Sequence, residues 1–229
     1  MIERDSNLAN PALTDIIGKI EKAARLADRK SSDIALIAVS KTRSSDEIRP
    51  LLVAGHRLFG ENRVQEAAAK WPDLQAEYPD IQLHMIGQLQ SNKAAEAVAL
   101  FDSIHSLDRP SLIKALAREM DRQDRRIPCF LQVNIGEESQ KGGCDITAIP
   151  DLLTLAGQSG IEIVGLMAVP PENTNPVPYF ALLAKLARDH GLDRLSMGMS
   201  GDFETAIKLG ATHVRVGTAL FGPRATPAG

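Results

Sequence analysis

The chain has 229 residues, of which 44% are hydrophobic and 24% charged, and its formal net charge is -3. This length and composition predict one soluble globular domain with a sizeable core. There is no excess of basic residues and only 4% of the residues are aromatic, which argues against a nucleic-acid-binding protein.

The sequence also argues against a disulfide-rich, metal-binding or membrane protein. The two cysteines, Cys129 and Cys144, form no CxxC pair and have no histidine at a metal-ligand spacing. The N-terminus, MIERDSNLAN, is too polar for a signal peptide, and no apolar run is long enough to span a bilayer. We therefore expect a cytoplasmic protein without a metal ion or a membrane partner.

Apolar residues at helical spacing predict an amphipathic helix over about 11–29, before any strand. Apolar runs then alternate with helical patterns. The predicted strands cover residues 35–41, 57–62, 81–87, 103–107, 127–135, 161–169, 194–199 and 213–222. The predicted helices between them cover residues 44–55, 63–74, 91–101, 110–123, 146–159, 178–191 and 202–210. Ser44 and Glu47 form a capping box at the first of these helices, and Pro50 shortens or kinks it.

Eight strands that alternate with helices predict an α/β fold, a single (β/α)8 TIM barrel over residues 1–229. Several strands are continuous apolar runs, as is typical of strands that are covered on both faces. The chain ends soon after the eighth strand, so we expect the N-terminal helix to cover that gap and the tail, residues 223–229, to be flexible. An open doubly wound sheet is the alternative, but no glycine-rich dinucleotide motif follows the first strand.

Polar residues end several predicted strands, at the end of a barrel where active sites lie. Lys41 ends the first strand and Asn62 the second, while His84 and Arg215 lie in the third and the eighth. Each residue taken singly is more often structural, as a strand's exit into water, a hydrogen-bonding group or an ion-pair partner. Together, however, the strand ends are too polar and too rich in glycine to be packing residues alone.

The loops after the seventh and eighth strands predict a phosphate site. SMGMSGD leads into a helix, and VGT follows the eighth strand. Their small residues allow the backbone N–H groups of Ser200, Gly201 and Gly217 to approach phosphate oxygens. Either loop alone is better explained as a tight turn beside a capped helix, whereas both loops on the two expected strands favour a phosphate site.

A phosphate site and the Lys41 amine at one end of a barrel suggest a short phosphorylated carbonyl compound held as a Schiff base. Two ligand classes fit this description. One is a sugar-phosphate substrate, as in an aldolase, and the other is pyridoxal 5'-phosphate (PLP). These residues leave the choice open.

Seven segments together closely resemble the YggS/PROSC family of pyridoxal phosphate homeostasis proteins, in family order from about residue 34 to 222. They are VSKTR, FGENRVQE, HMIGQLQSNK, IHSLD, NIGEESQKGG, GLMAV and LSMGMSGDFETAIKLGATHVRVGTALFG. The resemblance implies a fold type III PLP-binding barrel, like the N-terminal domain of alanine racemase but without the C-terminal β-domain.

The same resemblance implies the cofactor site. It places the Schiff base on Lys41, the phosphate on Ser200, Gly201, Gly217 and Thr218, and Arg215 near the pyridine nitrogen. It places Asn62, His84 and Met85 around the cofactor, with Met85 and Arg63 standing where many members have phenylalanine and tyrosine. Arginine only donates hydrogen bonds, so it favours an unprotonated ring nitrogen and a weak electron sink.

We therefore expect a non-catalytic PLP carrier of the cytoplasm, a monomer or weak dimer, that delivers the cofactor to PLP-dependent apo-enzymes. A weak amino-acid racemase is one alternative, although neither Tyr78 nor Tyr179 is placed to oppose Lys41, which leaves His84 or His105 as the second base. A Schiff-base lyase acting on a phosphorylated carbonyl substrate is the other alternative.

Overall fold

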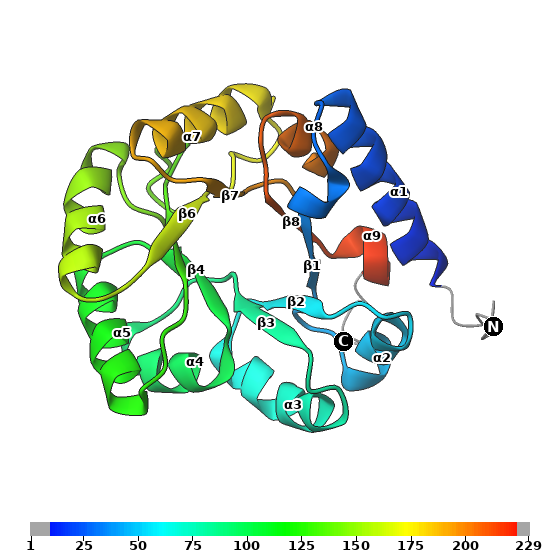
Figure 1. Cartoon of the computed structure of the whole chain (residues 1–229), viewed down its shortest axis with the longest axis horizontal. Helices are drawn as coiled ribbons and strands as arrows, with labels where there is room; N and C mark the ends of the chain where they lie inside the picture. Colours follow the sequence, from blue (N-terminus) through cyan, green and yellow to red (C-terminus); the bar gives the residue numbers. More distant parts are fainter. Residues whose placement is uncertain (1–9, 224–229) are drawn as a thin grey trace.

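Eight parallel strands close into a barrel in the computed structural model of the chain, which describes residues 10–223 (Figure 1). Each strand pairs with the next along the sequence, and β8 pairs with β1. The strands are β1 Ala35–Val39, β2 Leu58–Glu61, β3 Gln82–Met85, β4 Ser103–Leu107, β5 Cys129–Gln132, β6 Ile163–Met167, β7 Arg194–Ser196 and β8 His213–Val216. The predicted TIM barrel is confirmed, and the open sheet is excluded.

The helices lie around the outside of the barrel (Figure 1). They are α1 Pro11–Leu26, α2 Ser45–Val53, α3 Val64–Glu77, α4 Ala94–Leu100, α5 Pro110–Gln123, α6 Ile149–Gln158, α7 Val177–Asp189, α8 Phe203–Lys208 and α9 Thr218–Phe221, with 3-10 turns η1 Ser31–Asp33, η2 Ser91–Lys93 and η3 Ile146–Ala148. The predicted capping box is present at α2, which continues through Pro50 for only one more turn. Within residues 10–223, every helix is too short or too polar to cross a bilayer.

Helix α1 covers the side of the barrel that has no long helix after β8. It packs against α8 and α9 (Figure 1). Asn10 caps its start by accepting a hydrogen bond from the Leu13 N–H at 3.0 Å, and Pro11 occupies the first turn. Beyond its end, Arg29 donates to the carbonyl oxygens of Ile207 and Ala211, each at 2.8 Å, which ties the connection into β1 to α8.

The predicted eighth strand, 213–222, is too long. The strand ends at Val216, and the short helix α9 follows, with the N–H groups of Leu220 and Phe221 bonded to the Gly217 carbonyl at 2.9 and 3.0 Å. A short apolar run does not by itself distinguish a strand from a helix. The predicted tail lies outside the described residues, except for its first residue.

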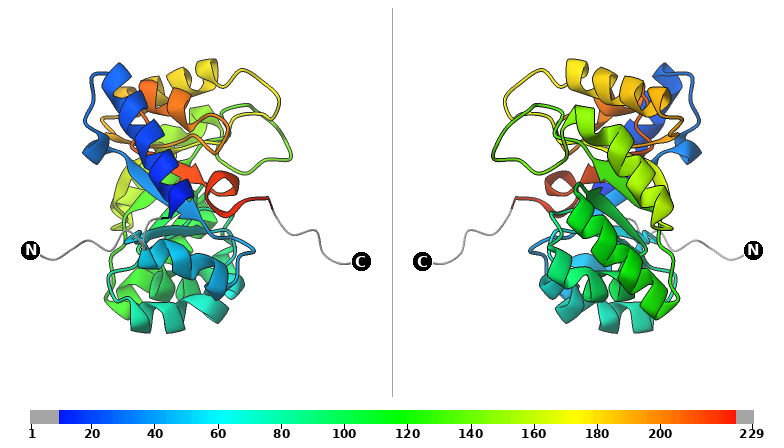
Figure 2. Two further views of the ribbon diagram at one scale, coloured as in Figure 1. Left: turned by 90° about the vertical axis from the view of Figure 1, so that its right-hand side faces the viewer. Right: turned by 90° about the vertical axis from the view of Figure 1, so that its left-hand side faces the viewer.

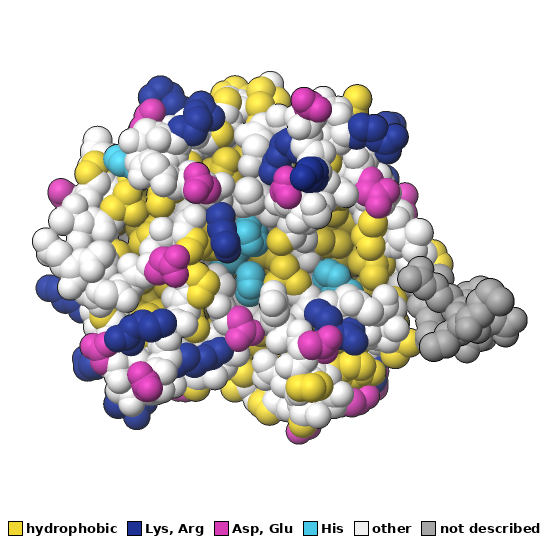
Figure 3. Space-filling model, viewed as in Figure 1, with side chains coloured by type: hydrophobic (Ala, Val, Ile, Leu, Met, Phe, Trp, Pro, Cys, Tyr) yellow, Lys and Arg dark blue, Asp and Glu magenta, His cyan; other side chains and the backbone are white. Residues whose placement is uncertain are grey.

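Side chains that alternate along the strands form two layers. Val214 and Val216 of β8 belong to the apolar core between the barrel wall and the helices. His213 and Arg215, which alternate with these valines, point to the other side, where the rings of His84 and His105 also lie. Because these rings come from β3, β4 and β8, they meet inside the barrel, and Figure 3 shows histidine side chains at its centre.

Long loops after β5 and β6 project from one end of the barrel, as the two side views in Figure 2 show. This is the end where the strands terminate, because all eight strands run in parallel. The loops after β1, β2, β7 and β8 lie at the same end. The fold therefore brings together residues that are far apart in the sequence.

Candidate functional site

A pocket of about 440 Å³ opens at the C-terminal end of the barrel. It is called the Lys41 pocket below. Residues expected from the sequence form much of its lining: Lys41, Asn62, Ser200, Gly201, Arg215, Gly217 and Thr218. Its volume falls within the range of roughly 300–1,000 Å³ that is usual for small-molecule sites.

Two of the expected residues, His84 and Met85, do not line the Lys41 pocket. His84 lies in the barrel interior, and Met85 is buried in the core between the barrel and the helices, with 1% exposure. Neighbouring residues of a strand point to opposite faces, so both cannot face one pocket. From this segment it is Ile86 that lines the pocket, a residue that the sequence analysis missed although the alternation along the strand could have indicated it.

Sequence reasoning also missed residues that loops carry into the pocket. Glu172 comes from the loop after β6. Val169 and Met199, which end two of the predicted strands, lie in the loops after β6 and β7 and also line the pocket. Glu172 is the carboxylate in the lining. No local pattern in the sequence indicates that an exposed loop residue turns toward a pocket.

Arg215 carries the buried positive charge of the site, with 4% exposure. Its guanidinium donates to Ser196 Oγ at 2.7 Å and to the Ala168 carbonyl at 3.0 Å, so both hydrogen bonds go to neutral groups. Burial lowers the pKa of Arg215 to about 10, against the opposing effect of the Asp202 charge. The guanidinium therefore stays charged at neutral pH and favours an anionic or electron-rich ligand.

A chain of hydrogen bonds supports Arg215 from inside the barrel. Ser196 Oγ accepts from Arg215 and is also hydrogen-bonded to His105 Nδ1, 2.8 Å away. His105 Nε2 is in turn hydrogen-bonded to His84 Nδ1 at 3.0 Å. The chain orients the guanidinium, and neither histidine lines the Lys41 pocket.

The barrel histidines are neutral. Burial lowers the pKa of His84 to about 3 and that of His213 to about 4, and it holds the pKa of His105 well below its ordinary value. Nearby positive charges act in the same direction, among them Arg194 for His84 and His213. These rings therefore act as hydrogen-bonding and packing groups at neutral pH.

The two predicted phosphate loops lie side by side and are joined directly. Ser200 Oγ accepts a hydrogen bond from the Gly217 N–H at 3.2 Å. A Cβ at Gly217 would lie 3.3 Å from Val39 Cβ, so glycine allows this loop to pass close to β1. Gly198 has a φ of 93°, and a Cβ there would lie 2.5 Å from Ala206 Cβ. Both loops thus depend on small residues to bring their backbones to the pocket.

Other candidates from the sequence lie elsewhere. Lys93 of η2, a second lysine that follows a barrel strand, pairs with Glu96 at 2.9 Å and lines a separate pocket. Neither Tyr78, which packs against the Arg57 guanidinium, nor Tyr179 of α7 lines the Lys41 pocket. Residues 10–223 contain no group of three or more His, Cys, Asp or Glu side chains arranged to hold a metal ion.

This fold and site place the chain among PLP-type barrels: the family described as the alanine racemase N-terminal domain matches residues 17–225. A pyridoxal phosphate homeostasis protein of Pseudomonas aeruginosa is 39% identical over 220 residues, covering 93% of this chain and 94% of that protein. The pyridoxal phosphate homeostasis protein of Escherichia coli is 35% identical over 225 residues, covering 93% of this chain and 95% of that protein. The chain belongs to the family of pyridoxal phosphate homeostasis proteins, as its sequence motifs predicted.

Solved structures agree with this assignment. PipY of Synechococcus elongatus, solved with PLP bound, is 38% identical with a TM-score of 0.74, covering 89% of this chain and 100% of that one. Alanine racemase of Streptomyces coelicolor is 20% identical with a TM-score of 0.67, covering 94% of this chain but 59% of the enzyme. The second likeness shows the fold alone.

Proposed function

We propose that this protein binds PLP in the Lys41 pocket and acts in PLP homeostasis, storing the cofactor and delivering it to apo-enzymes. One observation carries the proposal: a single pocket collects a lysine amine, a buried arginine and two small-residue loops. These groups match the aldehyde, the ring nitrogen and the phosphate of PLP. The PLP-bound PipY structure and the names of the curated relatives support the same ligand.

Each part of the lining has a role in this proposal. The Lys41 amine condenses with the aldehyde, and one water molecule leaves. Backbone N–H groups of Ser200, Gly201 and Thr218 and the hydroxyls of Ser200 and Thr218 bind the phosphate, and Gly217 allows the second loop to approach it. Arg215 donates to the ring nitrogen, and Asn62 lies beside the ring. Bound PLP supplies an electron sink, which Arg215 keeps weak by leaving the nitrogen unprotonated.

The interior of the barrel supports a carrier rather than a racemase. Racemisation needs one base on each face of the substrate. His84 and His105 are bonded to each other inside the barrel, and neither these histidines nor the two tyrosines line the pocket. Glu172 is the group that favours a second candidate, a weak racemase-like activity, because its carboxylate shares the pocket with Lys41.

A visible spectrum before and after borohydride reduction tests the proposal. We expect a yellow protein whose chromophore borohydride fixes on Lys41, and no covalent chromophore in Lys41→Ala. Peptide mapping that finds the label on Lys93 instead would refute the assignment. A protein that ignores PLP but traps a phosphorylated sugar on Lys41 under borohydride would support the lyase alternative.

A further inference from the structure

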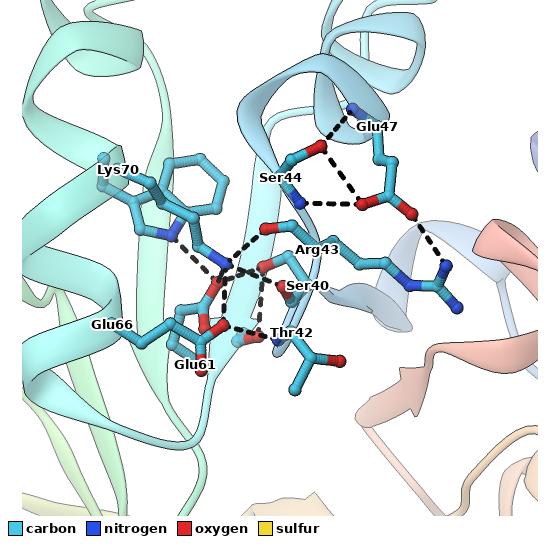
Figure 4. A network of polar contacts seen from close by, with 10 residues as sticks. Ser40, Thr42, Arg43, Ser44, Glu47, Glu61, Glu66 and Lys70 are labelled. Carbon is cyan, nitrogen blue, oxygen red and sulfur yellow. Dashed lines mark hydrogen bonds and ion pairs between the residues drawn. The ribbon is translucent and has the colours of Figure 1, made fainter. Parts of the chain in front are cut away.

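The residues on both sides of Lys41 are held by side chains from β2 and α3. Lys70 Nζ donates to the Ser40 carbonyl at 2.8 Å and to the Arg43 carbonyl at 3.0 Å. Glu66 Oε1 accepts from the Thr42 N–H at 2.5 Å. Figure 4 shows these side chains gathered against residues 40–43, called the Lys41 turn below.

Glu61 of β2 connects the Lys41 turn to Lys70 and Trp71 of α3. Its side chain is fully buried, and its Oε1 accepts from Ser40 Oγ at 2.6 Å and from Trp71 Nε1 at 3.0 Å. The same oxygen lies 2.8 Å from Lys70 Nζ, and the Lys70 side chain is only 10% exposed. Glu61, Glu66 and Lys70, the Lys70 cluster, therefore form one network around the turn (Figure 4).

A gain in folding stability does not by itself explain the buried ion pair between Glu61 and Lys70. Desolvating both charges offsets their attraction, so well-packed apolar residues are often as stabilising as such a pair. An apolar pair, however, would not bond the carbonyls of Ser40 and Arg43. The ammonium of Lys70 faces four acceptor atoms, on Glu61, Glu66 and these two carbonyls. The pair therefore defines the conformation of the turn.

The backbone of the Lys41 turn needs such support. Thr42 has a φ of 62°, in the left-handed region that a β-branched residue rarely adopts. A residue in that region is strained and persists only when its surroundings hold it. Arg43 extends the support to α9, because it donates to the Gly222 carbonyl at 2.5 Å and its guanidinium lies over the Phe221 ring.

We propose that the Lys70 cluster is a positioning device that holds the Lys41 turn so that the Lys41 amine faces the pocket. The proposal rests on the proposed function, in which Lys41 captures PLP. Its members are positioning residues that act through the backbone on either side of Lys41. Without them, the turn relaxes from its strained conformation, and the amine loses its alignment with the phosphate loops.

The test uses the double variant Glu61→Gln/Lys70→Met, which removes both buried charges at nearly constant size. Glu66, whose side chain is 28% exposed, loses its ion pair with Lys70 but keeps the hydrogen bond from the Thr42 N–H. The matched control is Arg49→Met/Glu77→Gln, which removes an exposed ion pair between α2 and α3. Thermal unfolding checks that both variants fold. Binding of pyridoxine 5'-phosphate, which lacks the aldehyde, measures the phosphate site without the covalent bond.

We expect the Lys70 cluster variant to bind pyridoxine 5'-phosphate as the wild type does but to capture PLP roughly tenfold or more slowly, because small misplacements cost rate steeply. The pH midpoint of the PLP absorbance should also move in this variant. The control variant should change neither the rate of PLP capture nor this midpoint. Hydrogen exchange of the Lys41 turn in the PLP-free protein should quicken.

The positioning role would be overturned if the folded Lys70 cluster variant matched the wild type in three measurements. These are the rate of PLP capture, the pH midpoint of the PLP absorbance and the hydrogen exchange of the Lys41 turn. A wild type that binds PLP without a bond to Lys41 would instead overturn the proposed function. The hydrogen exchange of the turn would still decide whether the cluster holds it.

Discussion

Ser200 is the residue whose removal best separates phosphate binding from loop structure. Its hydroxyl lies in the Lys41 pocket and accepts the Gly217 N–H at 3.2 Å. The substitution Ser200→Ala therefore removes two interactions at once. One joins the two loops in the presence or absence of a ligand, and the other is formed only with a phosphate.

The two losses differ in size. A neutral hydrogen bond such as that from the Gly217 N–H contributes about 0.5–1.5 kcal/mol, whereas a bond to a charged group contributes about 1.5–3 kcal/mol. Loss of the bond to phosphate alone corresponds to a weakening of roughly 12- to 150-fold in Kd. Pyridoxal has no phosphate, so its affinity should fall only by the smaller contribution of the loop contact.

Titration calorimetry with PLP and with pyridoxal, on wild type and Ser200→Ala, completes a thermodynamic cycle. The difference between the two ligands isolates the phosphate contact. Ser32→Ala is the matched control, because Ser32 is an exposed serine in η1, before β1. An equal loss of affinity for both ligands would show that Ser200 only joins the loops, and equal affinity of the wild type for both would refute the phosphate site itself.

Three further outcomes follow from the structure. Gly198→Ala should lower the melting temperature and weaken PLP binding, because the residue has positive φ and its Cβ would meet Ala206 at 2.5 Å; calorimetric unfolding that matches wild type would contradict this. Stability should fall as the pH is lowered from about 6.5 toward the pKa values near 3 and 4 of His84 and His213, because in that window the unfolded chain binds more protons than the folded one. Urea unfolding at about pH 7 and about pH 4.5 measures this slope, which should be shallower in His84→Gln; an equal slope would assign the pH dependence to other groups. The PLP-loaded protein should exchange the α-proton of L- or D-alanine in deuterated water far more slowly than about 1 per second, the lower range of ordinary enzymes; NMR that finds faster exchange, lost in Lys41→Ala, would establish an enzyme.

The order of strands and helices and the closed barrel were predictable from the sequence, because they rest on local hydrophobic periodicity and on the regular alternation of elements. The placement of Lys41, Arg215 and the two glycine-containing loops followed from one further rule, that parallel strands end at the same end of a barrel. The family motifs then assigned PLP to residues that the pattern alone left open between two ligand classes.

Only the tertiary structure decided which side chains meet. Strand alternation separated Met85 from the pocket, and the turn at Gly217 ended the eighth strand before its apolar run was complete. The pairing of Glu61 with Lys70 against the Ser40 carbonyl joins β2, α3 and the end of β1, and it has no local pattern to reveal it. Sequence periodicity records which face of an element is apolar, whereas contacts between polar groups depend on how the strands are staggered and how the helices pack on them.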